Sequence, residues 1–203
     1  RRIKPLNDGG YLFIGERITD NNLYFSDVHA GRLDSLGNIL WAKHFPLINN
    51  QTAHDFVEMP DGSFFISGYS ETVALGATPY ILQIDIEGNL IQEHYPQPAG
   101  FSNMNINYSN LSLKRNGNAL FSGHQSGSLV NRIAFCMEVD SMVNIVWDST
   151  FIRGTNFISL PLNNGGMILY GLNLDSGTFL LDFDGFGVQK SSFIFTEYPT
   201  KVF

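Results

Sequence analysis

A pattern that recurs four times along the chain limits its possible folds more than any other feature. In each copy, an Asp-Gly or Asn-Gly turn signal is followed by a short apolar run that ends on glycine: residues 8–15, 61–68, 116–123 and 164–171. The start positions of successive copies differ by 53, 55 and 48 (61 − 8, 116 − 61 and 164 − 116). A period of about 50 residues is typical of propellers and solenoids, in which each unit buries its faces against its neighbours.

An aspartate turn follows each apolar run at a similar distance. The aspartates lie 26, 24, 24 and 20 positions after their own turn signals: Asp34, Asp85, Asp140 and Asp184. Before each aspartate an apolar residue follows a polar one, and this period of two predicts a strand with one wetter face. The polar residues on that face are Arg32, Gln83, Glu138 and Asp182.

Two further strands are expected in each unit, one before the turn signal and one after the aspartate. They span residues 1–6, 54–59, 108–113 and 157–162, and residues 39–45, 90–95, 145–151 and 188–193. No long apolar stripe has helical spacing, so no substantial helix is expected. The sequence therefore predicts an all-β protein, a single β-propeller of four-stranded antiparallel blades. The expected blades are residues 1–50, 51–105, 106–154 and 155–203.

The four blades present are predicted to be part of a larger ring. Their strands follow one another in simple order, and no spare strand is placed to close a ring between the two ends. Residues 196–203 follow the last expected strand and are read as the start of a fifth unit. A closed ring of four blades is the alternative, because an open arc would expose edge strands and blade faces.

Composition excludes several classes of partner. The net charge is −7 and no basic stripe is visible, so nucleic acid is not expected as a partner. No apolar stretch approaches the roughly 20 residues of a membrane span, so membrane insertion is not expected. The one cysteine, Cys136, lies between apolar residues and is interpreted as a buried, inert thiol.

No residue pattern identifies a catalytic, cofactor-binding or metal site, and none of these is predicted. The repeated aspartates are interpreted as turn caps, because each lacks the closely spaced oxygen ligands of a calcium loop. Zinc motifs of the HxH or HExxH type and the GxSxG element of hydrolases are absent. His54 and Asp55 open an expected inner strand and are the weak candidates for a channel-facing site.

The repeat resembles that of secreted β-propeller proteins of Bacteroidota, many of which are exported by the type IX secretion system. The resemblance covers nearly the whole chain and is closest in the first unit: Asp8, Gly9, Gly10, Gly15, Asp34, Gly37, Asn38 and Trp41. It weakens where Val143 replaces the turn glycine, and in the fourth unit, which lacks the tryptophan. It implies an extracellular or outer-surface location and a scaffold with no catalytic residues.

Two functions are therefore weighed. The first is a non-catalytic surface scaffold that binds a protein or a glycan, or builds a larger extracellular complex. Recognition is then expected in the links at residues 19–27, 70–79, 97–107 and 125–131. The alternative is an arc of a propeller enzyme, of the lyase, lactonase or quinoprotein type, with active residues outside the repeat core. The repeat glycines Gly15, Gly68, Gly123 and Gly171 are expected to serve packing or backbone shape.

Overall fold

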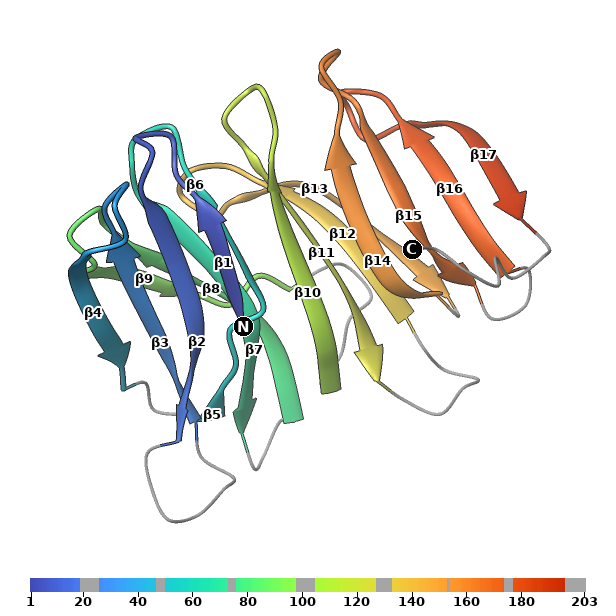
Figure 1. The fold of residues 1–203 in the computed structure, drawn as a ribbon. Helices are drawn as coiled ribbons and strands as arrows, with labels where there is room; N and C mark the ends of the chain where they lie inside the picture. The colour runs from blue at the N-terminus through green and yellow to red at the C-terminus, as the bar shows by residue number, and fades with distance from the viewer. Residues whose placement is uncertain are drawn as a thin grey trace.

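The computed structural model consists of four antiparallel β-sheets arranged as propeller blades (Figure 1). It describes residues 1–18, 26–46, 50–72, 76–97, 105–126, 133–152, 154–173 and 177–195. These residues form strands, turns and short connections, and no helix is present among them. The prediction of an all-β propeller with four blades is confirmed.

The first two blades contain nine strands. Blade 1 comprises β1 (Arg2–Pro5), β2 (Tyr11–Ile18), β3 (Ser26–Leu33) and β4 (Ile39–Phe45). Blade 2 comprises β5 (Asn50–Gln51), β6 (Asp55–Glu58), β7 (Phe64–Thr72), β8 (Gly76–Ile84) and β9 (Leu90–His94), with β5 and β6 both paired to β7.

The last two blades contain eight strands. Blade 3 comprises β10 (Asn105–Leu113), β11 (Ala119–Ser126), β12 (Ile133–Val139) and β13 (Ile145–Ile152). Blade 4 comprises β14 (Gly154–Pro161), β15 (Met167–Asn173), β16 (Gly177–Phe183) and β17 (Gln189–Phe195). Within each blade, consecutive strands pair with their chain neighbours except where β6 and β5 share β7.

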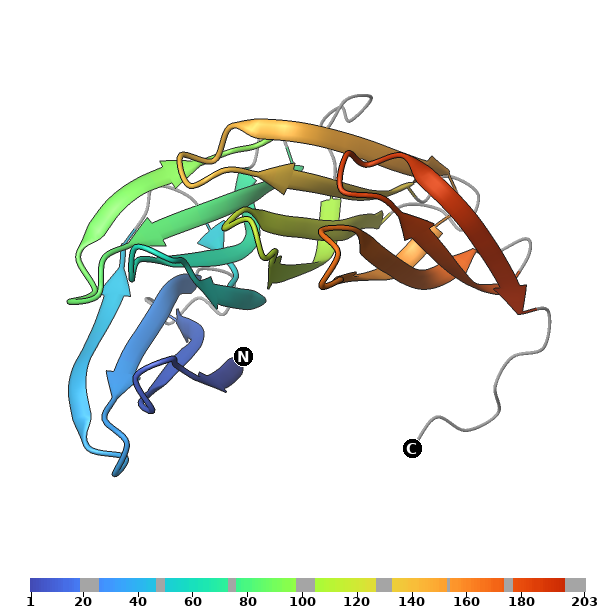
Figure 2. The ribbon, with the colours of Figure 1, turned by 90° about the horizontal axis from the view of Figure 1, so that it is seen from above.

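The blades stand side by side along an open arc (Figure 2). The innermost strands β1, β6, β10 and β14 lie toward the concave side of the arc, and β10 contacts both β6 and β14. The fourth strand of each blade lies toward the convex side. Segments from different repeats, far apart in the sequence, therefore meet along the concave side, where a site shared by several blades would form.

Each aspartate turn is closed by hydrogen bonds to its own side chain. The Asp34 carboxylate accepts bonds from the backbone N–H groups of Leu36 and Asn38, both at 2.8 Å, and from the Asn38 side chain at 2.8 Å. The side-chain bond from Asn38 and then the backbone bonds lower the pKa of Asp34. The same turn recurs at Asp85, Asp140 and Asp184. The interpretation of these aspartates as turn caps is confirmed.

The inner strand of blade 2 is split, which the sequence did not predict. Between β5 and β6, the backbone N–H groups of Thr52 and His54 bond to the carbonyls of Tyr69 and Ser67, at 3.0 and 2.8 Å. The chain there passes so close to β7 that a Cβ built on Gly68 would lie only 1.8 Å from the Thr52 carbonyl oxygen. The backbone can take this path because Gly68 has no side chain.

The apolar core lies between the blades as three clusters. Between blades 1 and 2 it includes Leu12, Ile14, Phe64 and Ile66; between blades 2 and 3, Phe65, Phe121, Phe135 and Met137; between blades 3 and 4, Cys136, Leu169, Leu181 and Phe183. Burial raises the pKa of the Cys136 thiol, which suits the expected inert role.

The prediction of a wetter face on the third strand of each blade is wrong for two blades. Gln83 is 8% exposed and Glu138 is 2% exposed, because both faces of these strands pack against adjacent blades. Glu138 remains charged in the interface by pairing with Lys114, whose Nζ lies 2.6 Å away. The alternation of apolar and polar residues therefore marks the strand correctly, but blade stacking replaces solvent as the cover of its polar face.

Candidate functional site

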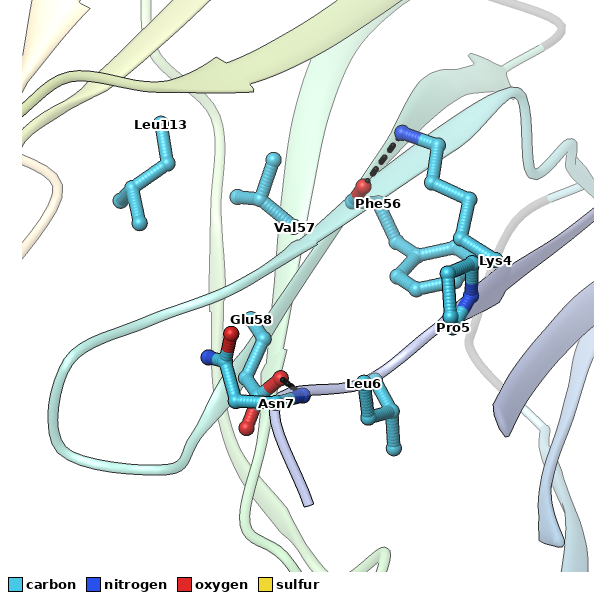
Figure 3. A pocket seen from close by; sticks show the side chains of 8 residues that line it. All are labelled: Lys4, Pro5, Leu6, Asn7, Phe56, Val57, Glu58 and Leu113. Carbon is cyan, nitrogen blue, oxygen red and sulfur yellow. Dashed lines mark hydrogen bonds between the residues drawn. The ribbon is translucent and has the colours of Figure 1, made fainter. Parts of the chain in front are cut away.

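A small pocket opens where the innermost strands of blades 1, 2 and 3 meet (Figure 3). Its volume is about 220 Å³, and its lining combines charged, polar and apolar side chains: Lys4, Pro5, Leu6, Asn7, Phe56, Val57, Glu58 and Leu113. We call it the axial pocket. It is the place at which the repeat brings polar groups of three blades together.

The wall of the axial pocket rests on an ion pair between two blades. Lys4 on β1 places its Nζ 2.6 Å from Asp55 Oδ1 on β6, and the same Nζ donates a hydrogen bond to the Phe56 carbonyl at 2.8 Å. The Lys4 ammonium also lies 5.2 Å from the centre of the Phe56 ring, within the range of a cation–π contact. Lys4 is thereby held at the pocket edge, with its side chain about one-third exposed (35%).

Asp55 joins three blades rather than two. Its Oδ2 accepts hydrogen bonds from the Asn110 side chain at 2.7 Å and from the Leu111 backbone at 3.2 Å, both on β10. Its Oδ1 accepts a bond from the Phe56 backbone in addition to the Lys4 ion pair. The Asp55 side chain is 1% exposed, so both carboxylate oxygens are engaged and shielded from a ligand. Such a carboxylate can organise a site but cannot serve as an accessible base.

His54 is similarly occupied by contacts with the protein. The backbone N–H of Ser109 donates to His54 Nδ1 at 3.0 Å, and His54 Nε2 lies 3.3 Å from Thr52 Oγ1. Its ring also packs edge-on against Tyr69. Because Nδ1 is the acceptor, Nε2 carries the proton of the neutral ring. Burial lowers the pKa of His54 from 6.5 to about 4, so the imidazole is neutral at physiological pH.

The open side of the axial pocket offers one carboxylate to a ligand. Glu58 Oε2 accepts a hydrogen bond from the Asn7 backbone at 2.8 Å, and this pair lies across the pocket from Lys4 (Figure 3). Glu58 is half-buried, and Val57 and Leu113 supply apolar wall beside it. The arrangement can accept hydrogen bonds from a small hydroxyl-bearing or amino-bearing group.

A second depression lies between the turns of blades 2 and 3. It has a volume of about 290 Å³ and is lined by Pro60, Asp61, Asn116, Gly117, Asn118, Asp140 and Ser141. Its carboxylates already accept bonds, Asp61 from Ser63 and Asp140 from Met142 and Asn144. Across the described ranges, no group of three or more His, Cys, Asp or Glu residues is placed to hold a metal ion.

The two weak candidates, His54 and Asp55, both lie at the junction of blades 2 and 3. Neither lines the axial pocket, although residues that follow them in the chain do. Sequence reasoning missed Lys4 and Glu58, since a lysine and a glutamate in separate repeats give no signal of contact. The expected recognition links at residues 19–27, 70–79, 97–107 and 125–131 lie partly outside the described residues, and residues 196–203 lie wholly outside them. Among the described residues, no helix has the length and apolar character needed to cross a membrane.

Comparison with known proteins identifies the fold but no family. No protein-family model matches the sequence, and no curated protein matches it. A protein of unknown function from Dyadobacter fermentans is similar at 13% identity and a TM-score of 0.63, over 95% of this chain and 63% of that one. A Hadza microbial sialidase is similar at 10% identity and a TM-score of 0.66, over 97% of this chain and 46% of that one.

A third similar structure is an endo-arabinase from Bacteroides thetaiotaomicron, at 11% identity and a TM-score of 0.51 over 90% of this chain and 75% of that one. The similar structures therefore include propeller-like proteins of Bacteroidota, the phylum to which the sequence resemblance points. The chain spans less than two thirds of the Dyadobacter protein and of the sialidase. At these identities the likeness concerns the fold alone.

Proposed function

We propose that this protein is a non-catalytic propeller scaffold, located outside the cell or on the outer cell surface, that binds a glycan or protein partner within a larger assembly. One observation carries the proposal: His54 and Asp55, the candidate acid–base pair beside the innermost strands, are engaged in contacts that hold blades together. Asp55 accepts bonds from two blades while 1% exposed, and His54 has both ring nitrogens within reach of protein partners. General acid–base catalysis needs a group that reaches the substrate, and neither side chain is free to do so.

The axial pocket is the binding site that we assign to this scaffold. Glu58 and the partly exposed Lys4 give it both signs of charge, and apolar wall separates them. Hydroxyl-rich ligands bind through such mixtures of acceptors, donors and apolar surface. The secreted propellers that the repeat resembles support the extracellular location, and type IX export is the route that this resemblance suggests.

The alternative is an arc of a propeller enzyme whose active residues lie outside the repeat core. The names of two similar structures, a sialidase and an endo-arabinase, favour it. A fold shared at such low identity hosts many functions, so these names alone do not assign an activity. The alternative requires an accessible acid–base pair, and His54 and Asp55 do not supply one.

A glycan array followed by titration calorimetry tests the binding role. The intact chain should retain at least one glycan, and Glu58→Gln should weaken that binding by about tenfold, the effect of losing one charge-assisted hydrogen bond. Glu87→Gln, at an exposed turn position, is the matched control and should bind as the wild type does. Equal affinity of the Glu58→Gln and wild-type chains for the glycan would show that the axial pocket is not the binding site.

A further inference from the structure

Two tryptophans each place their ring over the turn glycine of the neighbouring blade. Trp41 on β4 donates its indole N–H to the Ile86 carbonyl in the aspartate turn of blade 2, at 2.9 Å. Its ring lies over Gly88 of that turn, so that a Cβ on Gly88 would come within 2.8 Å of the ring. The ring of Trp147 on β13 lies over Gly187 of blade 4, again at 2.8 Å, while its indole N–H donates to Glu138 of its own blade. In each case the tryptophan ring occupies the space that a side chain at the turn glycine would need.

The interface between blades 2 and 3 lacks both the tryptophan and the glycine of this contact. The tryptophan position of blade 2 holds Gln92, which is exposed, and the glycine position of blade 3 holds Val143. Val143 adopts φ of 61°, like the glycines that it replaces, and its side chain is 8% exposed within the core cluster of blades 2 and 3. A side chain thus fills the turn position where no tryptophan covers it. Tryptophan and glycine are present together or absent together across each interface.

Blade 1 has the glycine of this pair but no tryptophan over it. Gly37 occupies the same turn position with φ of 87°, and a Cβ built there would meet no atom within 4 Å. The face of blade 1 opposite blade 2 carries exposed apolar side chains near this turn. Residues alternate between the two faces of a strand, and Leu12 and Ile14 pack toward blade 2. The opposite face therefore carries three large exposed apolar side chains: Ile3 (60%), Tyr11 (38%) and Leu40 (54%).

We propose that this outward face of blade 1 is a docking surface for a further propeller blade that carries a tryptophan four residues after its turn position, as Trp41 follows Gly37 and Trp147 follows Val143. The incoming indole ring would cover Gly37 as the rings of Trp41 and Trp147 cover Gly88 and Gly187. A second copy of this chain docked head to tail does not fit, because the corresponding residue on β17 is Ser191. The inference does not depend on what the axial pocket binds.

A five-bladed fusion tests the proposal on the full chain. A copy of residues 105–156, which contains blade 3, is placed directly before Arg1. The register sets this junction: Arg2 pairs with Ile14 as Ile158 pairs with Tyr170, so residue 156 leads into the position of Arg1. Four fusions are compared by urea unfolding: the parent, Gly37→Val, Trp147→Gln in the added copy, and both changes together. Gly37→Val in the unfused chain reports the cost of backbone strain alone.

We expect the effects of Gly37→Val and of Trp147→Gln in the added copy on the unfolding midpoint to depend on each other. Gly37→Val should lower the unfolding midpoint more in the parent fusion than in the unfused chain, and Trp147→Gln in the added copy should remove this excess. If Gly37→Val lowered the unfolding midpoint equally in the unfused chain, in the parent fusion and in the fusion with Trp147→Gln, the proposal would be overturned. If the fusion does not fold, the variant Ser191→Trp of the unfused chain supplies the missing ring. Concentration-dependent association of this variant in sedimentation, abolished by adding Gly37→Val, would support the docking surface. A variant that stays monomeric would contradict it. Self-association of the wild type that Gly37→Arg abolishes would identify a second copy as the occupant and would also overturn the proposal.

Discussion

Replacing Gly68 with alanine should destabilise the protein, whereas the same replacement at Gly15 should not. Both glycines end the apolar run of their repeat, and the sequence predicts the same structural role for both. Their surroundings differ. A Cβ on Gly68 would lie 1.8 Å from the Thr52 oxygen and 3.0 Å from the Tyr80 ring. A Cβ on Gly15 would meet only Arg1 Cγ, at the ordinary contact distance of 3.7 Å.

The size of the effect follows from what must move. A carbon and a carbonyl oxygen approach to about 3.3 Å, so the Thr52 carbonyl would have to shift by roughly 1.5 Å. That carbonyl accepts the Tyr80 hydroxyl hydrogen bond at 2.9 Å, and Tyr80 is fully buried. Overpacking costs about 1–3 kcal/mol, and an unpaired buried hydroxyl costs about 1–3 kcal/mol. We expect Gly68→Ala to lower the free energy of unfolding by roughly 2–6 kcal/mol.

Urea unfolding of the two alanine variants is the assay. Gly15→Ala should be neutral or stabilise by up to about 1 kcal/mol, because alanine restricts the unfolded chain more than glycine does. The urea dependence of the unfolding free energy should stay unchanged in both variants, so that the midpoints can be compared directly. A Gly68→Ala midpoint at or above that of Gly15→Ala would refute the reasoning from the Thr52 carbonyl.

Three further predictions concern charge and metal. Burial lowers the pKa of His54 from 6.5 to about 4, so the unfolded chain binds a proton at this imidazole more readily than the folded chain does. The free energy of unfolding should therefore rise as the pH increases from 4 to 6.5. This rise with pH should be smaller in His54→Gln than in the exposed control His44→Gln. Glu138→Gln should cost roughly 3–5 kcal/mol in urea unfolding, because it leaves the buried Lys114 ammonium without a counter-charge; an unchanged midpoint would contradict this. EDTA should leave the melting temperature unchanged, because hydrogen bonds close the aspartate turns; a fall that calcium restores would show that a metal supports them.

The sequence predicted the parts of the fold that local chemistry determines. The Asp-Gly and Asn-Gly signals mark turns because these residues accept the backbone conformations that turns require, and Gly9, Gly62, Gly117 and Gly165 all have positive φ. The aspartates after the third strands bond to backbone groups only two and four residues away. Because each turn signal and its hydrogen-bond partners lie within a few residues, these turns can be recognised from the local sequence alone.

Features that depend on contact between strands or blades were not predicted. The split of the inner strand into β5 and β6 depends on Gly68, which lies on a different strand from Thr52 and looks like any other repeat glycine. The burial of Glu138 depends on blade 4 and on Lys114, Asn116, Asn118 and Trp147, all of which donate hydrogen bonds to its carboxylate. Period-two patterning reports which residues share a face but does not say what covers that face.

The candidate site was predicted only in part. His54 and Asp55 attracted attention as polar residues at the start of an inner strand, and they do lie where blades 2 and 3 meet. Their engagement with Lys4, Ser109 and Asn110 could not be foreseen, because these partners belong to other repeats and are distant in the sequence. The same contacts turn a suspected reactive pair into a junction between blades.

The most direct test of the central claim, that Asp55 joins blades and performs no chemistry, is a turnover assay on the intact chain and on Asp55→Asn. The substrates are glycosides, lactones and polyuronates, and the melting temperature of each protein is measured alongside. The account predicts no turnover above the buffer rate for either protein, and a lower melting temperature for Asp55→Asn because its bond to Lys4 is weakened. Turnover by the wild type that disappears in Asp55→Asn at an unchanged melting temperature would contradict the account and favour the enzyme.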